Sequence, residues 1–274
     1  MTLKKSIKKT ISRLLPKGIF KEKLKMFWYN ALASKSIKYK LIEKKNSNLI
    51  YETIYEGLNL FTYEPLYTIT PDFDNYQHFY KIKSGDVVID GGANVGILSL
   101  LFLMKVGDKG YVHSFEPDQY NIDKLKANFS LNNCSDNYRI HNELMWNEET
   151  EIDFQESGTV ASSALWFSGT DGIVKKKTTS LDTWEKINKL ERLDFIKLDI
   201  EGAEIQAIEG CLALIEKYEP NFAIASYHIV DGKPTYLMLE NFFKSINYPC
   251  LTKRFGGYEI ITFAGSHVAN HFKN

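Results

Sequence analysis

Residues 87–96, Val-Val-Ile-Asp-Gly-Gly-Ala-Asn-Val-Gly, limit the fold of this chain more than any other stretch. An apolar run short enough for a buried strand leads directly into a glycine turn, and a second apolar run long enough for a helix follows. Glycine has no Cβ, so a ligand can approach the backbone closely at such a turn, where the free amides of the helix start face it. The stretch therefore predicts one strand–turn–helix unit of a parallel sheet, with a ligand site at the turn.

The chain after residue 84 repeats this alternation of short apolar strands and amphipathic helices, which is typical of a doubly wound α/β fold. The predicted strands are residues 87–90, 111–115, 138–142, 195–199 and 222–226, and the predicted helices between them are residues 95–106, 119–131 and 204–215. Residues 151–180 interrupt the alternation and are interpreted as extra strands around a loop. A helix at 235–246 and two strands at 250–252 and 258–263 predict an antiparallel hairpin at a sheet edge.

Residues 1–80 form a predicted helical, basic extension that precedes a main domain of residues 81–274. Helices are predicted at 6–15 and 21–33, where apolar residues recur at helical spacing. The first 45 residues contain 14 Lys and Arg against Glu22 and Glu43, a balance of 14 − 2 = +12, so the remainder carries −12 in a chain of zero net charge. A basic amphipathic helix suits an anionic membrane surface or packing against a partner subunit, and a solvated helix is the simpler interpretation.

The charge distribution and the cysteines indicate in which compartment the protein works and which partners it has. Three scattered cysteines, Cys134, Cys211 and Cys250, lack metal-ligand spacing, and an odd number argues against a disulfide framework. No apolar run approaches the length of a membrane span. We therefore expect a cytoplasmic protein, with the basic N-terminus as its contact to the inner membrane face. A nucleic-acid partner is not expected, because the main domain is acidic and shows no aromatic stacking platform.

The glycine spacing argues against a nicotinamide dinucleotide. A Gly-x-Gly-x-x-Gly frame that starts at Gly91 meets Ala93 in its second place, and one that starts at Gly92 meets Asn94. Glu116 follows the second strand in Phe-Glu-Pro, where its carboxylate can accept two ribose hydroxyls. Asn142 ends the third strand, on the adenine side of such a ligand, although a turn-forming asparagine fits there equally well.

Three blocks in this order resemble the FkbM family of methyltransferases: Asp-Gly-Gly-Ala-Asn-Val-Gly at 90–96, Phe-Glu-Pro at 115–117, and Ile-Lys-Leu-Asp-Ile-Glu-Gly-Ala-Glu at 196–204, with Thr-Ser-Leu-Asp-Thr at 179–183 in character. The resemblance implies a Rossmann-like class I methyltransferase fold, with a mostly parallel seven-stranded sheet and an antiparallel C-terminal hairpin. It also implies S-adenosyl-L-methionine as the cofactor, with Asp90 near its cationic end. The expected cofactor-binding residues are Asp90, Gly91, Gly92, Asn94, Gly96, Glu116, Pro117, Asn142 and Asp199.

Methyl transfer to a hydroxyl requires that the acceptor oxygen lose a proton, so a general base or a metal ion is needed beside it. His228 at the end of the fifth strand is the predicted base, with Glu201 orienting it or the substrate. Asp199 and Lys197 complete the predicted catalytic group, and Lys197 is expected to pair with Asp199 or to contact substrate. Glu204 is a weaker candidate, because the helix dipole alone favours an acid in the first turn of a helix. A divalent cation on Asp199, Glu201 and His228 is an open alternative. Residues 158–163 with Trp166 and Phe167 form either a rim over the acceptor or a surface hairpin.

The family resemblance implies an O-methyltransferase, and the expected acceptor is a sugar hydroxyl in a surface glycan or glycolipid. O-methylation of a small natural product is one alternative. A non-catalytic binding module with a methyltransferase fold is another, and a homo-oligomer is compatible with either. The intact set of Asp90, Glu116, Asp199 and Glu201 favours an enzyme over a binding module.

Overall fold

The computed structural model describes residues 18–33, 36–43, 49–158, 163–165, 169, 171–256 and 259–271. The chain divides into two compact units, Met1–Thr70 and Pro71–Asn274. The predicted helix at residues 6–15 lies outside the described residues. The division at Thr70 differs from the predicted boundary near residue 80, and it assigns Tyr76 to the second unit.

The first unit combines a helix with a small sheet, so the expectation of a helical extension is incomplete. Helix α2 (Ile19–Leu32) precedes strands β1 (Ile37–Glu43), β2 (Leu49–Tyr55) and β3 (Leu58–Thr62). They form an antiparallel sheet in the order β1-β2-β3. Glu56 and Gly57 connect β2 to β3 with φ values of 49° and 85°. A two-residue turn with positive φ at both positions matches the twist of a hairpin. The sequence signal was the run of β-branched and aromatic residues at 50–55.

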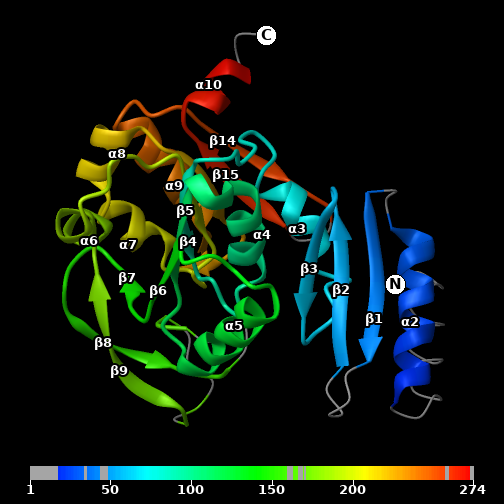
Figure 1. Cartoon of the computed structure of the whole chain (residues 1–274). Helices are drawn as coiled ribbons and strands as arrows, with labels where there is room; N and C mark the ends of the chain where they lie inside the picture. The colour runs from blue at the N-terminus through cyan, green and yellow to red at the C-terminus, as the bar shows by residue number, and fades with distance from the viewer. Residues whose placement is uncertain are drawn as a thin grey trace. The chain divides into compact units, whose positions relative to one another are not determined.

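The second unit contains the predicted seven-stranded sheet, in the order β14-β15-β11-β10-β4-β5-β6 (Figure 1). The strands are β4 (Val87–Gly91), β5 (Tyr111–Phe115), β6 (Tyr138–His141), β10 (Phe195–Leu198), β11 (Asn221–Ala225), β14 (Cys250–Arg254) and β15 (Ile260–Ala264). The five strands β11, β10, β4, β5 and β6 are parallel, and β15 pairs antiparallel with both β11 and β14. The fold is thus the predicted Rossmann-like class I methyltransferase fold with an antiparallel C-terminal hairpin.

Helices cover both faces of this sheet (Figure 1). Helices α4 (Ile97–Val106) and α5 (Gln119–Leu131) follow β4 and β5, and a buried apolar cluster joins the other face to α6 (Leu181–Asn188), α7 (Glu204–Glu209), α8 (Leu212–Tyr218) and α9 (Thr235–Ser245). Three short helices, α3 (Thr70–Asn75), η1 (Gly107–Lys109) and α10 (Ser266–His271), complete the described set. In that set, no helix is both long and apolar enough to cross a membrane.

The single helix predicted at 204–215 is two helices, because the chain breaks at Gly210. A Cβ at Gly210 would lie 2.3 Å from the carbonyl oxygen of Trp146, so the backbones meet too closely for any other residue. Asp182 of α6 then accepts hydrogen bonds from the amides of Ala213 and Leu214, which begin α8. The Thr-Ser-Leu-Asp-Thr block therefore has a structural use, since its aspartate satisfies free amides at a helix start.

The interruption at residues 151–180 contains extra strands, as predicted. Strands β7 (Leu144–Met145), β8 (Glu151–Gln155) and β9 (Ile173–Thr179) form a sheet in the order β7-β9-β8. The backbone amides of Ser157 and Gly158 donate to the carboxylate of Asp118, at distances of 3.0 and 2.8 Å. This carboxylate also caps α5, so the end of β8 is tied to the edge where the site lies. A short hairpin of two strands, β12 (Ile229–Val230) and β13 (Lys233–Pro234), precedes α9.

Candidate active site

A pocket opens at the carboxyl ends of β4, β5 and β10, the edge at which open α/β sheets bind ligands. Six of the predicted site residues line it: Gly92, Asn94, Glu116, Pro117, Asp199 and Glu201. The apolar part of its lining includes Phe115, Leu144, Met145, Phe154 and Ile200. The pocket thus has carboxylates at two places and apolar walls between them, which suits a ligand with both a flat apolar ring and polar groups.

The glycine turn is shaped by close backbone packing. At Gly92, φ is 71°, and a Cβ would lie 1.9 Å from the carbonyl oxygen of Asp199. The amides of Gly92 and Ala93 both donate to the carbonyl oxygen of Phe115, at 3.0 and 2.9 Å. Asn94 also adopts a positive φ of 50°. The turn is therefore fixed between β5 and β10, with no space for a side chain at Gly92.

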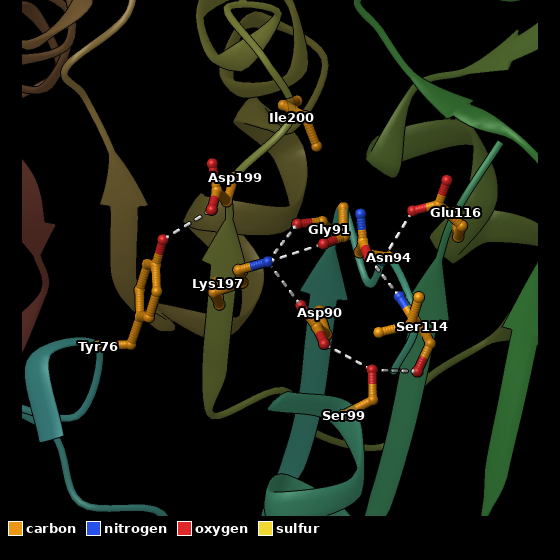
Figure 2. A network of polar contacts seen from close by, with 12 residues as sticks. Tyr76, Asp90, Gly91, Asn94, Ser99, Ser114, Glu116, Lys197, Asp199 and Ile200 are labelled. Carbon is orange, nitrogen blue, oxygen red and sulfur yellow. Dashed lines mark hydrogen bonds and ion pairs between the residues drawn. The ribbon is translucent and has the colours of Figure 1, made fainter. Parts of the chain in front are cut away.

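A buried ion pair lies beneath this turn (Figure 2). The Lys197 ammonium contacts the Asp90 carboxylate at 3.0 Å and donates to the carbonyl oxygens of Gly91 and Gly92 at 3.1 and 2.9 Å. Ser99 donates to Asp90 at 2.5 Å, and Ser114 donates to Ser99 at 2.9 Å. Burial alone would lower the pKa of Lys197, but the carboxylates around it, Asp90 first, give a net rise. The ammonium therefore stays charged and holds the turn from below.

These contacts pair two of the predicted site residues with each other. Asp90 is fully buried and is not among the residues that line the pocket, and its carboxylate contacts Lys197. Lys197 pairs with Asp90, whereas pairing with Asp199 or contact with substrate was expected. The β4–β10 register explains this pairing, because Lys197 lies directly opposite Asp90 in adjacent parallel strands.

Glu116 lies at the end of β5 and lines the pocket. Its carboxylate accepts hydrogen bonds from the backbone amides of Asn94 at 2.7 Å and Asp118 at 3.0 Å, and from the side chain of Asn121 at 3.3 Å. Burial raises the pKa of Glu116, and the three donors oppose that rise. The carboxylate is thus oriented by two loops at once, which gives it a fixed direction within the pocket.

Asp199 follows β10 and lines the same pocket. Two tyrosines donate to its two carboxylate oxygens, Tyr76 at 3.0 Å and Tyr227 at 3.3 Å. Figure 2 shows the Tyr76 hydroxyl directed at Asp199 from the side opposite Glu116. Burial and the charge of Asp199 raise the pKa of both tyrosines, so they remain neutral donors. Sequence reasoning missed both, and Tyr76 in particular because it was assigned to the extension.

His228 lies between two carboxylates. Its Nδ1 atom is 3.1 Å from Glu204 and its Nε2 atom is 3.5 Å from Glu201. Burial alone would lower the pKa of His228, but the contacts with Glu201 and Glu204 outweigh burial and raise it to about 10. At neutral pH the ring is therefore an imidazolium, already protonated, and this environment argues against the base role that was predicted for it.

Glu204 connects His228 to the loop that carries Asp199 and Glu201. Its carboxylate accepts hydrogen bonds from the backbone amides of Ile200 at 3.1 Å and Gly202 at 3.2 Å. Between them Glu201 adopts a positive φ of 55°, a conformation that costs a residue other than glycine some strain. The buried Glu204 thus fixes the loop, a role that its favourable place at a helix start concealed in the sequence.

Two further carboxylates lie near Asp199. Burial and the charge of Asp199 raise the pKa of Asp72 to about 6. Burial, Asp72 and Asp199 raise the pKa of Glu259 to about 7. One carboxylate oxygen of Glu259 is buried and accepts no hydrogen bond within the described structure. This side of Asp199 therefore holds acidic groups that change protonation near neutral pH.

The arrangement does not reproduce the cation-binding set considered from the sequence. Asp199, Glu204 and His228 are the residues whose ligand atoms lie within 4.8 Å of one another, so Glu204 takes the place expected for Glu201. The His228 nitrogens face carboxylates as donors, and a cation would have to displace a proton there. The described residues thus fit an ion-paired imidazolium better than a metal centre.

The remaining predicted residues lie at the edge of the pocket or pack against the strands and helices that form it. Asn142 is exposed and donates to Gln119, and the following residue, Glu143, lines the pocket. A Cβ at Gly91 or Gly96 would lie 2.6 Å from Leu198 or 2.5 Å from Leu125, so both glycines serve packing. Trp166 and Phe167 lie outside the described residues. Unpredicted lining residues are Phe115, Asn121, Glu143, Leu144, Met145, Phe154, Ala164, Ile200 and Ala203.

The sequence of the second unit matches a known family over most of its length. Residues 90–250, more than half of the chain, match the profile described as the Methyltransferase FkbM domain. The chain belongs to the FkbM methyltransferase family. The matched range contains the glycine turn, Glu116, the Asp199–Glu204 loop and His228. None of the curated proteins compared with this FkbM methyltransferase matches it significantly.

Solved structures resemble this chain at low sequence identity. The FkbM methyltransferase of Methylobacillus flagellatus KT is 21% identical with a TM-score of 0.54, and the match covers 73% of this chain and 50% of that one. The chain therefore spans about half the length of that protein. An S-adenosylmethionine-dependent methyltransferase from Aquifex aeolicus is 12% identical with a TM-score of 0.42, over 73% and 93% of the two chains. Precorrin-6y C5,15-methyltransferase from Geobacter metallireducens is 12% identical with a TM-score of 0.45, over 76% and 94%.

Proposed function

We propose that this FkbM methyltransferase transfers the methyl group of S-adenosyl-L-methionine to a hydroxyl of a sugar, in a surface glycan or glycolipid. The observation that carries the cofactor assignment is the fixed carboxylate of Glu116 at the end of β5, beside a turn that admits no side chain at Gly92. A carboxylate at this edge accepts the two ribose hydroxyls, and the apolar wall that includes Leu144 and Met145 receives the adenine.

The opposite side of the pocket supports transfer to oxygen. Asp199 and Glu201 line the pocket beyond the glycine turn, and Asp72 and Glu259 lie near Asp199. In this proposal the Asp199 carboxylate accepts a hydrogen bond from the acceptor hydroxyl and orients its oxygen for attack on the methyl carbon. Positioning of this kind contributes much of the rate in a displacement reaction.

Proton removal is assigned to Glu259. The pKa of Glu259 is raised to about 7, close to the pH at which a general base is most effective. When bound, S-adenosyl-L-methionine would supply the methyl group to the acceptor oxygen and be released as S-adenosylhomocysteine, while the Glu259 carboxylate would take the proton that this oxygen loses. His228 keeps its proton throughout and holds Glu201 and Glu204 in place. Carboxylates that bind hydroxyl groups, with Tyr76 and Tyr227 beside them, fit a polyhydroxylated acceptor such as a sugar.

Calorimetric titration with S-adenosyl-L-methionine tests the cofactor assignment. We expect Glu116→Gln to weaken binding by about 10- to 100-fold, because hydrogen bonds to a charged group contribute roughly 1.5–3 kcal/mol. Glu216→Gln, on the exposed surface of α8, is the matched control and leaves affinity unchanged. Equal affinity of Glu116→Gln and the unsubstituted protein would refute the assignment.

The acceptor assignment requires a separate assay. Purified enzyme with the cofactor is incubated with lipid-linked and free oligosaccharides, and the products are examined by mass spectrometry for one added methyl group. We expect methylation of a sugar hydroxyl, and loss of it in Asp199→Asn with cofactor binding retained. Methylation of a nitrogen or of a protein side chain instead would contradict the sugar-hydroxyl assignment.

A further inference from the structure

Helix α2 of the first unit contacts its sheet through the polar side of the helix. Asn30 exchanges two hydrogen bonds of 2.8 Å with the backbone of Tyr39 in β1, and Glu22 accepts one of 3.3 Å from the hydroxyl of Tyr51 in β2. Tyr29 stacks on Tyr67 with ring centroids 4.2 Å apart. Residues 22, 26, 29 and 30 share one side of a helix, so this side faces the sheet.

The other side of α2 is apolar and exposed. Phe20, Phe27 and Trp28 are 71%, 68% and 56% exposed, and their spacing of seven and eight residues places them on one side of the helix. Leu32, one turn beyond Trp28, is 76% exposed. None of the residues of α2 is buried, and the helix contributes five of the 13 large apolar side chains that are exposed within the described residues.

This arrangement reverses the usual amphipathic pattern, in which the apolar stripe faces the core. Single exposed apolar side chains are common, but a row of aromatic residues on one helix marks an interaction site. We call Phe20, Phe27, Trp28 and Leu32 the aromatic face of α2. The unit's own sheet does not cover this face.

Lysines border the aromatic face on both sides. At 100° per residue, Lys21 lies between Trp28 and Leu32, and Lys23 lies next to Phe27 on the other flank. Lys25 lies just beyond Leu32 and pairs with Glu22 at 2.6 Å. Glu22, the acidic residue of α2, is on the side that faces the sheet. The sequence around the helix is also basic, with 14 Lys and Arg against two Glu in residues 1–45.

We propose that the aromatic face of α2 binds to the surface of an anionic lipid bilayer. An interfacial helix buries aromatic and leucine side chains at the headgroup boundary, while flanking lysines meet anionic headgroups. Tryptophan favours this boundary because its ring is apolar and its N–H group is polar. The flanking charge argues for a bilayer over a second copy of α2, because two copies would bring like charges together.

Vesicle co-sedimentation with the full chain tests the proposal. The probes are vesicles of phosphatidylcholine alone and of phosphatidylcholine with phosphatidylglycerol. We expect binding to the anionic vesicles, weaker at high salt, and a blue shift of tryptophan fluorescence that Trp28→Phe removes. The double variant Phe27→Ser/Trp28→Ser is expected to reduce the partition coefficient at least about tenfold, because binding scales with the buried apolar area.

The matched control is Ile187→Ser, which removes a 74% exposed apolar side chain from α6 in the second unit and should leave vesicle binding unchanged. Circular dichroism and calorimetric titration with the cofactor verify that each variant is folded. Absence of binding to anionic vesicles would overturn the proposal. So would a concentration-dependent dimer that Phe27→Ser/Trp28→Ser dissociates without any vesicle binding, since a second copy would then cover the face.

Discussion

The imidazole of His228 takes its role from its neighbours. A histidine at the end of a parallel strand near a ligand pocket is a reasonable base on chemical grounds. The two carboxylates at 3.1 and 3.5 Å reverse that role, because they stabilise the protonated ring. No pattern in the sequence places Glu204 opposite Nδ1, since the contact joins the first residue of α7 to a residue after β11.

The substitution Glu204→Gln removes the negative charge that faces His228 and keeps the size of the side chain. The amide oxygen can still accept from Ile200 and Gly202, but the attraction to the imidazolium is lost. We expect the free energy of unfolding near pH 6 to fall by roughly 1–3 kcal/mol, the cost of removing a charged hydrogen-bond partner. Denaturant titration at several pH values measures it.

The pH dependence of this difference follows from the pKa of His228, which is raised from 6.5 to about 10. A raised pKa contributes stability that is complete below the unfolded value and is lost as the pH rises through the folded value. The difference in the free energy of unfolding between the unsubstituted protein and Glu204→Gln should therefore be largest below about pH 6.5 and shrink toward pH 10. A gap that stays constant across this range would show that the charge of His228 is not involved.

At the scale of elements, the strand–turn–helix at residues 87–106 was predictable because its signals are local. The glycine turn, the strand end at Phe115 and the place of Glu116 all follow from patterns within a few residues. The break at Gly210 depends on the backbone of Trp146, and Tyr76 reaches Asp199 across 123 positions of sequence. Features set by long-range packing were the ones that the sequence did not reveal.

Gly92→Ala tests the backbone contact that shapes the turn. The added Cβ would lie 1.9 Å from the Asp199 carbonyl oxygen and φ is 71°, so the turn has to move away from β10. We expect a loss of roughly 1–3 kcal/mol in stability, the cost of a strained position, together with loss of cofactor binding. Gly256→Ala, where nothing lies within 4 Å of the new Cβ, is the control. Thermal unfolding that is unchanged in Gly92→Ala would contradict the geometry.

At the scale of the whole molecule, the pocket and the excess of positive charge lie in different parts of the chain. Every residue that lines the pocket lies in Pro71–Asn274, as do Asp72, Tyr76 and Glu259. The excess of positive charge lies in the first 45 residues, and the acidic remainder includes the pocket. The distribution of charge was predicted from the sequence, whereas the sheet in the first unit was missed despite the β-branched and aromatic residues at 50–55.

A chain that begins at Tyr63 tests this separation. It lacks β1, β2 and β3 but keeps every described residue of the pocket. We expect its affinity for S-adenosyl-L-methionine to stay within about twofold of the full chain, since independent sites couple weakly. Calorimetry measures the affinity, and circular dichroism verifies folding. A folded truncated chain with much weaker binding would show that the first unit contributes to the cofactor site.

The ion pair beneath the glycine turn also determines how the protein reacts with electrophiles. Amine-directed reagents need a neutral, accessible amine, and Lys197 is only 2% exposed with its pKa raised. The surface lysines therefore react first, while Lys197 is protected as long as β4 and β10 remain paired. Acylation of this one amine thus reports the separation of β4 from β10, and its rate measures how often the second unit opens.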